Sequence, residues 1–154
     1  MTAINGSPVT ILLVEDDPAH AEIVRRNFEE SRIANRVFHV EDGQAALDYL
    51  RRHDRYVHPA VSPRPDLVLL DLRLPKVDGQ EVLRQIKADP DLKGIPVVVL
   101  TTSKAEGDLV SAYERGACSY LVKPVDFDKF RRMLEAFGFY WLLWNQFPHD
   151  KPGA

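Results

Sequence analysis

The sequence predicts an α/β fold in which a parallel sheet is covered by helices on both faces. Two observations lead to this prediction. Short apolar runs rich in β-branched residues, which suit strands buried on both faces, alternate with longer segments whose apolar residues recur at helical spacing. Five such strand–helix pairs follow one another along the chain. Right-handed connections between successive strands then give a three-layer sandwich.

The first half of the chain opens on the run TILLV at Thr10–Val14, which is expected to be a buried strand. Pro18 suits the first position of the helix that follows, and Asp17 can cap it. A second strand is expected at 36–40, followed by a helix that Asp42 and Gly43 open. The connection from 53 to 65 contains three prolines and is expected to be an irregular surface loop.

The second half of the chain repeats the pattern more clearly. Asp78 and Gly79 start the third helix, and the fourth helix, over about 106–115, stops at Gly116, a natural C-terminal cap. The last helix is expected to start near Asp126 and continue to about Asn145. The remaining strands are expected at Leu67–Leu70, Val97–Leu100 and Ser119–Val122.

Length and composition limit the function classes. With 154 residues the chain is expected to form one domain over 9–147, between a flexible N-terminus (1–8) and a flexible tail (148–154). The formal charge of −3, without a stretch dense in Lys and Arg, argues against a nucleic-acid binder. No apolar run approaches the ~20 residues that span a bilayer. One cysteine and no signal pattern favour a cytoplasmic protein.

Polar residues directly follow the predicted strands. In a parallel sheet these carboxyl ends meet at one edge, where ligands bind at the point of strand-order reversal. Three or more carboxylates, a hydroxyl and an ammonium are therefore expected to share one rim. The residues concerned are Glu15, Asp16, Asp71, Thr101 and Lys123.

This set of groups points to phosphoryl transfer onto a carboxylate. Crowded carboxylates repel one another unless a cation neutralises them, and Mg²⁺ suits a few carboxylates together with water and a phosphate oxygen. A carboxylate beside that ion can attack phosphorus and form an aspartyl-phosphate. Lys123 and Thr101 would then donate to the new dianion. The five scattered histidines show no metal-ligand spacing and are expected to be solvated or structural.

Four stretches, ILLVEDDP, DLVLLDLRLPKVDG, VVVLTTS and GACSYLVKP, resemble those of two-component response-regulator receiver domains. The resemblance covers about residues 9–137. It implies the flavodoxin-like sheet with strand order 2-1-3-4-5. It also implies that Asp71 is the phosphoacceptor and that Mg²⁺ is held by Glu15, Asp16, Asp71 and the backbone carbonyl of Arg73.

The same resemblance assigns roles at the switch and outside the site. Thr101 matches the switch hydroxyl, Lys123 the phosphoryl-binding lysine, and Tyr120 the aromatic that turns with the switch. Lys123–Pro124 becomes a candidate for a cis peptide bond. The expected phosphodonor is a sensor histidine kinase, and the extra length at 53–65 resembles regulators paired with phytochrome-type kinases. With no effector domain expected, output would pass through altered protein contacts.

Two other functions fit the same sheet. A haloacid-dehalogenase-type hydrolase also uses Asp, Thr or Ser, and Lys on strand ends, but it needs a second acid where this chain has Arg73. A flavin- or nucleotide-binding module would need a glycine-rich loop after Val14, where this chain has acids. Turnover of a phosphomonoester would favour the first alternative, and a co-purifying yellow chromophore the second.

Residues 139–144, at the end of the last predicted helix, are all apolar, so the sequence predicts that this segment is buried on every side. A homodimer built on it is expected, since burying these aromatic groups would contribute several kcal/mol at ~25 cal/mol/Å². Folding back over the domain, or docking on a kinase, are the alternatives. The expected interface residues are Phe139, Tyr140, Trp141, Leu143 and Trp144.

Overall fold

The computed structural model describes residues 8–31 and 34–141. Its five strands form one parallel sheet in the order β2-β1-β3-β4-β5, which confirms the predicted fold. The strands are β1 (Val9–Val14), β2 (Asn35–Val40), β3 (Leu67–Leu70), β4 (Val97–Thr101) and β5 (Ser119–Val122).

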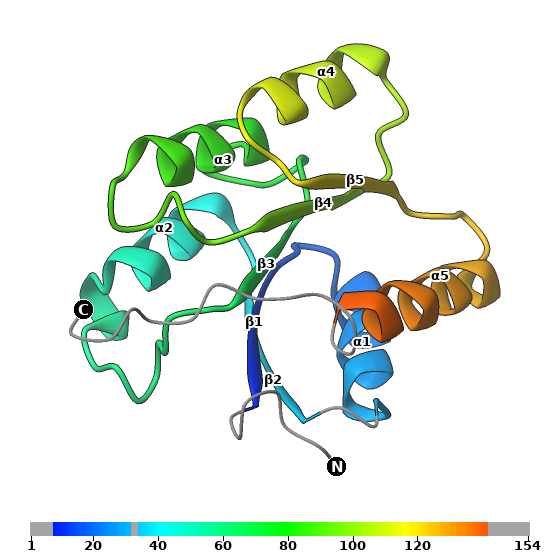
Figure 1. The fold of residues 1–154 in the computed structure, drawn as a ribbon, viewed down its shortest axis with the longest axis horizontal. Coiled ribbons are helices and arrows are strands. Elements are labelled where there is room, and N and C mark those ends of the chain that lie inside the picture. The colour runs from blue at the N-terminus through cyan, green and yellow to red at the C-terminus, as the bar shows by residue number, and fades with distance from the viewer. Residues whose placement is uncertain (1–7, 32–33, 142–154) are drawn as a thin grey trace.

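The helices lie in two layers, with α1 and α5 against one face of the sheet and α2, α3 and α4 against the other (Figure 1). Asp17, the predicted cap of the first helix, accepts hydrogen bonds from backbone N–H groups in the first turn, and Asp42 and Asp78, predicted to open their helices, also act as caps. The helices are α1 (Pro18–Glu29), α2 (Gly43–Arg51), α3 (Gly79–Ala88), α4 (Glu106–Glu114) and α5 (Phe127–Phe139).

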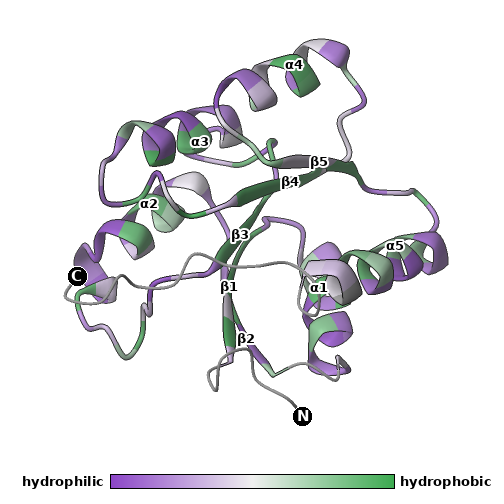
Figure 2. Cartoon of the chain, in the orientation of Figure 1, coloured by the Kyte–Doolittle hydropathy of each residue, from purple (hydrophilic) through white to green (hydrophobic). Residues whose placement is uncertain are grey.

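Alternation along the strands divides the core into two halves. On β3, Val68 and Leu70 face α2 and α3, whereas Leu67 and Leu69 face α1 and α5. Figure 2 shows the central strands as the apolar centre of the molecule, with more polar helices outside them. A parallel strand covered on both faces must be apolar throughout, which is why these runs are recognisable in the sequence.

The connection at 53–65 is mostly irregular, as expected, but contains one turn of 3₁₀ helix, η1 (Asp54–Tyr56). Ser62 is buried there, and its hydroxyl donates to the backbone carbonyl of Tyr56 at 2.7 Å. The Tyr49 hydroxyl of α2 donates to the carbonyl of Pro63 at 2.8 Å, which ties the connection to the domain.

Two expectations need correction, one about the Lys123–Pro124 peptide bond and one about Trp141. The Lys123–Pro124 bond is trans, because no cis peptide occurs in the described residues; the trans form is the lower-energy isomer of an X–Pro bond by about 0.5–1 kcal/mol. Trp141, expected at a dimer surface, is 8% exposed and packs within the protomer against Phe137, with ring centroids 5.7 Å apart. This part of the helix packs on α1, where Gly138 faces Phe28.

The other expected interface residues differ in what the structure shows. Tyr140 is 55% exposed, as a surface contact requires. The side chain of Phe139, together with Leu143, Trp144 and the predicted continuation to Asn145, lies outside the described residues. Among the described helices none is long and apolar enough to cross a membrane.

Candidate functional site

Two carboxylates meet at the carboxyl edge of the sheet because β1 and β3 are neighbours. Val14 is the register partner of Leu70, so the residues that follow them, Glu15 and Asp71, are adjacent. The N–H of Asp71 donates to the carbonyl of Val14 at 3.1 Å, which fixes this adjacency. Both carboxylates are buried, Glu15 at 1% and Asp71 at 6% exposure. Buried acids in this number require compensating donors or a cation.

Lys123 supplies the compensating charge from the end of β5. Its backbone N–H donates to the carbonyl of Thr101 at 2.7 Å, which places it beside β4. Its ammonium donates to Asp71 Oδ2 at 3.0 Å and also to Glu15 Oε2. The side chain is almost wholly buried, so this is an ion pair shielded from water rather than a surface contact.

Thr101 completes the surroundings of Asp71 from the end of β4. Its hydroxyl, fully buried, donates to Asp71 Oδ1 at 2.8 Å. The same oxygen accepts from the backbone N–H of Arg73 at 3.2 Å, where the chain turns after β3. Each oxygen of Asp71 is therefore held by donors from other parts of the chain.

Burial dominates the protonation of Glu15. Loss of water raises the pKa of this carboxyl, the nearby Lys123 ammonium opposes the rise, and the negative charge of Asp71 adds to it, so that the pKa reaches about 7. An acid in this state readily exchanges its proton for another cation near neutral pH.

The acidic groups fit a hard divalent cation. Glu15, Asp16 and Asp71 each offer a carboxylate oxygen, and these oxygens lie within 4.8 Å of one another. Asp16 is exposed, so water can reach the group and complete a coordination shell rich in oxygen ligands. No described contact places the carbonyl of Arg73 in this group, and its role as a ligand stays a prediction.

Tyr120 is connected to the carboxylates through the loop between β4 and α4. Its hydroxyl donates to the carbonyl of Ser103 at 3.0 Å, on the loop between β4 and α4. That loop also bears on the site, since the N–H of Ser103 donates to the hydroxyl of Thr101 at 3.4 Å. Tyr120 thus contacts the segment that carries Thr101 and not Asp71 itself.

The structure adds a residue that the sequence analysis did not assign to the site. His20, on α1, places Nδ1 3.1 Å from the Lys123 ammonium and packs edge-on against Phe130, with ring centroids 5.7 Å apart. Burial and the neighbouring ammonium lower the pKa of His20, so its neutral ring can accept a hydrogen bond from Lys123. The residues are 103 positions apart, and no local pattern marks such a pair.

Asp108, on α4, makes a second set of contacts that no sequence pattern predicted. Its carboxylate accepts from the Arg73 guanidinium at 2.6 Å and from the Ser103 hydroxyl at 2.5 Å. The backbone carbonyl of Asp108 accepts from Gln80 on α3 at 3.0 Å. This residue thus joins the loops after β3 and β4 to two helices. It also engages Arg73, at the position where a hydrolase of this type would need an acid.

Comparisons with known proteins agree with this geometry. A family model for the response regulator receiver domain matches residues 11–135. The probable methanogenesis regulatory protein FilR2 of Methanothrix harundinacea is 50% identical over 141 residues, covering 92% of this chain and 88% of FilR2. Response regulator Rcp1 of Synechocystis sp. is 42% identical over 142 residues, covering 92% of this chain and 95% of Rcp1.

Solved structures give the same picture. The Mn²⁺-bound form of Rcp1 matches with a TM-score of 0.87 at 42% identity, covering 92% of this chain and 100% of that structure. The phosphorylated cyanobacterial phytochrome response regulator RcpA also matches with a TM-score of 0.87, at 38% identity, covering 93% of this chain and 100% of RcpA. With its sheet order, its cluster of acidic residues and these relatives, the chain belongs to the response-regulator receiver domains of two-component signalling.

Proposed function

We infer that Asp71 accepts a phosphoryl group from a phosphohistidine of a sensor histidine kinase. One observation carries this inference: the buried carboxylate of Asp71 lies between the Lys123 ammonium and the Thr101 hydroxyl, next to two further acids. A carboxylate placed among donors that can neutralise a phosphoryl group is suited to nucleophilic attack on phosphorus. The relatives Rcp1 and RcpA, both response regulators, support the assignment.

In the proposed transfer, an oxygen of Asp71 forms a bond to phosphorus as the bond between phosphorus and the kinase's histidine nitrogen breaks. The electron pair of the broken bond returns to the imidazole. Glu15, Asp16, Asp71 and the Arg73 carbonyl would hold Mg²⁺, which supplies positive charge to the phosphoryl oxygens when it is bound. Lys123 offers the second positive charge, since its ammonium already contacts Asp71.

After transfer, the donors around Asp71 must change partners. In this structure the Thr101 hydroxyl donates a hydrogen bond to Asp71 Oδ1. After transfer it would turn to a phosphoryl oxygen and draw the loop after β4 with it. Because the Tyr120 hydroxyl holds the carbonyl of Ser103 on that loop, a shift of the loop would release or turn this ring. The surface formed by α4, β5 and α5 would thereby change between two states and alter protein contacts.

The kinase proposed as partner is of the phytochrome type, by analogy with RcpA, which is a phytochrome response regulator. A homodimer is also proposed, in which exposed Tyr140 forms part of the contact and Trp141 holds the helix end onto the domain. The absence of nucleic-acid binding and the cytoplasmic location stay predictions from the sequence.

Phosphorylation can be tested by intact mass after incubation with Mg²⁺ and a small phosphodonor such as acetyl phosphate. The wild type should gain the mass of one phosphoryl group, and Asp71→Asn should gain none. Asp66→Asn is the matched control, because it makes the same chemical change at the other end of β3, where the carboxylate accepts from the N–H of Thr10. A modified Asp71→Asn, an unmodified wild type, or steady turnover of a phosphomonoester would contradict the proposal.

A further inference from the structure

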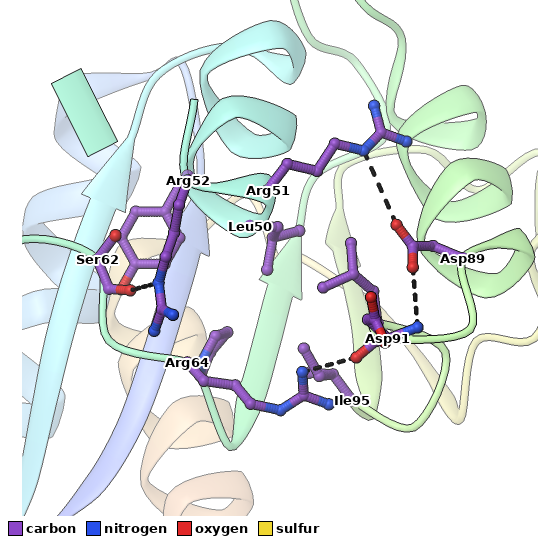
Figure 3. Close-up of a pocket in the computed structure, with 11 residues that line it drawn as sticks. Leu50, Arg51, Arg52, Ser62, Arg64, Asp89, Asp91 and Ile95 are labelled. Atoms are coloured by element: carbon purple, nitrogen blue, oxygen red, sulfur yellow. Dashed lines mark hydrogen bonds and ion pairs between the residues drawn. The ribbon is translucent and has the colours of Figure 1, made fainter. Parts of the chain in front are cut away.

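A cavity of about 320 Å³ lies at the edge of the sheet opposite Asp71. It is enclosed by the end of α2, the connection at 52–65 and the connection between α3 and β4 (Figure 3). Pro65 and Ile95 in its lining come just before β3 and β4, so the cavity is at the amino ends of these strands. The phosphoacceptor follows the carboxyl end of β3, and the two sites are therefore separate.

The floor of the cavity is apolar and its wall is fixed. Leu92 and Ile95 are buried in the core below it. The Tyr49 hydroxyl donates to the carbonyl of Pro63 at 2.8 Å, and buried Ser62 donates to the carbonyl of Tyr56. Because these bonds hold the connection in place, the cavity is preformed, as small-molecule sites usually are.

Positive charge in the cavity is only partly neutralised. Arg52 Nε donates to the carbonyl of Ser62 at 3.3 Å, and Arg64 donates to the carbonyl of Asp91 at 2.6 Å. Among the described residues, neither arginine forms an ion pair with a carboxylate, and both residues are exposed. Figure 3 shows Arg52 on one side of the space and Asp89 and Asp91 on the other, with Arg64 reaching along its edge to Asp91.

The remaining charges leave the balance positive. Arg51 reaches Asp89 only at 4.0 Å, a loose contact. The lining contains three arginines and two aspartates, so its net charge is positive. Asp91 offers an acceptor to any donor that a ligand carries opposite its acidic group.

The backbone conformation of Arg52 also bears on the role of its side chain. This residue ends α2 in the left-handed region, with φ of 56°. Glycine is the usual residue there, because a side chain is disfavoured in that conformation. An arginine at such a position, with its guanidinium at the cavity, is consistent with a use for that side chain.

We propose that this cavity binds a small organic anion, with its carboxylate or phosphate group held by Arg52 and Arg64 and its carbon skeleton over Leu92 and Ile95. Guanidinium groups match both acids through paired N–H donors, which lysine cannot do. The cavity volume falls at the lower end of the range for small-molecule sites, which favours a compound of metabolite size.

The test is a titration of the ¹⁵N-labelled protein, without divalent metal, followed by the backbone amide signals. The probes are inorganic phosphate and AMP for the phosphate arm, and acetate and glutamate for the carboxylate arm. At least one probe should give saturable shifts at residues 49–52, 62–65 and 89–95, with a dissociation constant of about 1 mM or tighter. The arm that saturates identifies the acidic group.

Three variants decide whether the arginines bind the probe. Arg52→Gln with Arg64→Gln should weaken binding at least tenfold, and Arg64→Lys should weaken it several-fold although the charge is kept. The control, Arg26→Gln with Arg132→Gln, removes the same charge from exposed positions on α1 and α5 and should bind like the wild type. No saturable shift with any probe, equal binding by the first double variant, or equal weakening in the control would overturn the proposal. Phosphorylation of Asp71 should be unchanged in all these variants.

Discussion

The ammonium of Lys123 and the carboxylate of Asp71 form an ion pair of 3.0 Å in which 1% and 8% of the two side chains are exposed. Lys123 also contacts the buried Glu15, so one cation serves two acids whose side chains are almost wholly buried. The free-energy cost of removing this cation is set mainly by the negative charges that would stay buried without a partner.

Replacing Lys123 with methionine should therefore destabilise the metal-free protein at pH 8 by about 3–5 kcal/mol. The two acids would remain buried without a counter-charge. Adding Mg²⁺ should restore part of the stability, because a cation can take the place of the ammonium between the acids. Urea unfolding with and without Mg²⁺ measures both effects. Lys104→Met, at an exposed lysine, should change the free energy of unfolding by less than about 0.5 kcal/mol. Equal stability of both variants would show that the buried charges do not depend on Lys123.

The Thr101→Val variant should accept a phosphoryl group, but the loop after β4 should not change conformation in response. Asp71, the proposed acceptor, is intact in this variant, whereas the hydroxyl that would turn to the phosphoryl group is missing. Amide signals of residues 103–109 should shift on phosphorylation in the wild type and in Thr101→Ser, and stay in place in Thr101→Val. The same shifts in Thr101→Val would mean that another group moves the loop.

Mg²⁺ affinity should depend on pH through Glu15. Burial raises the pKa of this carboxyl to about 7, and the Lys123 ammonium limits the rise. Below that pH the acid holds a proton that the metal must displace, so affinity should rise up to about tenfold per pH unit and level off above about pH 7. Mg²⁺ titrations from about pH 5 to about pH 9 test this slope. Glu15→Gln should bind more weakly and without the step. A wild-type affinity that does not vary with pH would refute the assignment.

Gly79 is predicted to be irreplaceable at the start of α3. A Cβ there would lie 2.3 Å from the carbonyl oxygen of Asp71 and 2.5 Å from the Cα of Leu72, both backbone atoms. Gly79→Ala should therefore push α3 away from β3, lower stability by about 1–3 kcal/mol and slow phosphorylation. Gly94→Ala is the control, since a Cβ at that glycine meets nothing within 4 Å. Thermal unfolding and the rate of phosphorylation measure the two effects.

Trp141 and Tyr140 should separate folding from association. Trp141→Ala should cost about 3–5 kcal/mol, as for other buried aromatic residues, because the ring packs on Phe137 within the protomer. Tyr140→Glu, at a side chain 55% exposed, should leave the fold intact and reduce the mass measured by light scattering from dimer to monomer. A Tyr140→Glu variant that remains dimeric would place the contact elsewhere.

The sequence predicted strands and caps well, because both depend on local chemistry. Buried parallel strands must be apolar on both faces, and Asp17 or Asp78 before a helix has few other uses. The adjacency of Glu15 and Asp71 is different. It requires that β1 pair with β3, and apolar runs do not encode strand order, which came from the resemblance to receiver domains.

Contacts between distant elements were beyond the sequence. His20 meets Lys123, and Arg73 meets Asp108, through the packing of helices against loops, and neither pair shares a periodic pattern. The apolar run correctly indicated burial of Trp141, whereas Tyr140 beside it is 55% exposed, and hydrophobicity does not say what covers a ring. The cavity beside Arg52 and Arg64 depends on the path of an irregular connection, which residue patterns do not specify.

The contact between Glu15 and Lys123 spans 108 positions in the chain. A polypeptide still being synthesised, or one cut before β5, would contain the acceptor Asp71 yet lack the cation that faces it. Such a fragment would be a poor substrate for any kinase. Under the proposed function, Asp71 would become able to accept a phosphoryl group only after β5 has paired with β4.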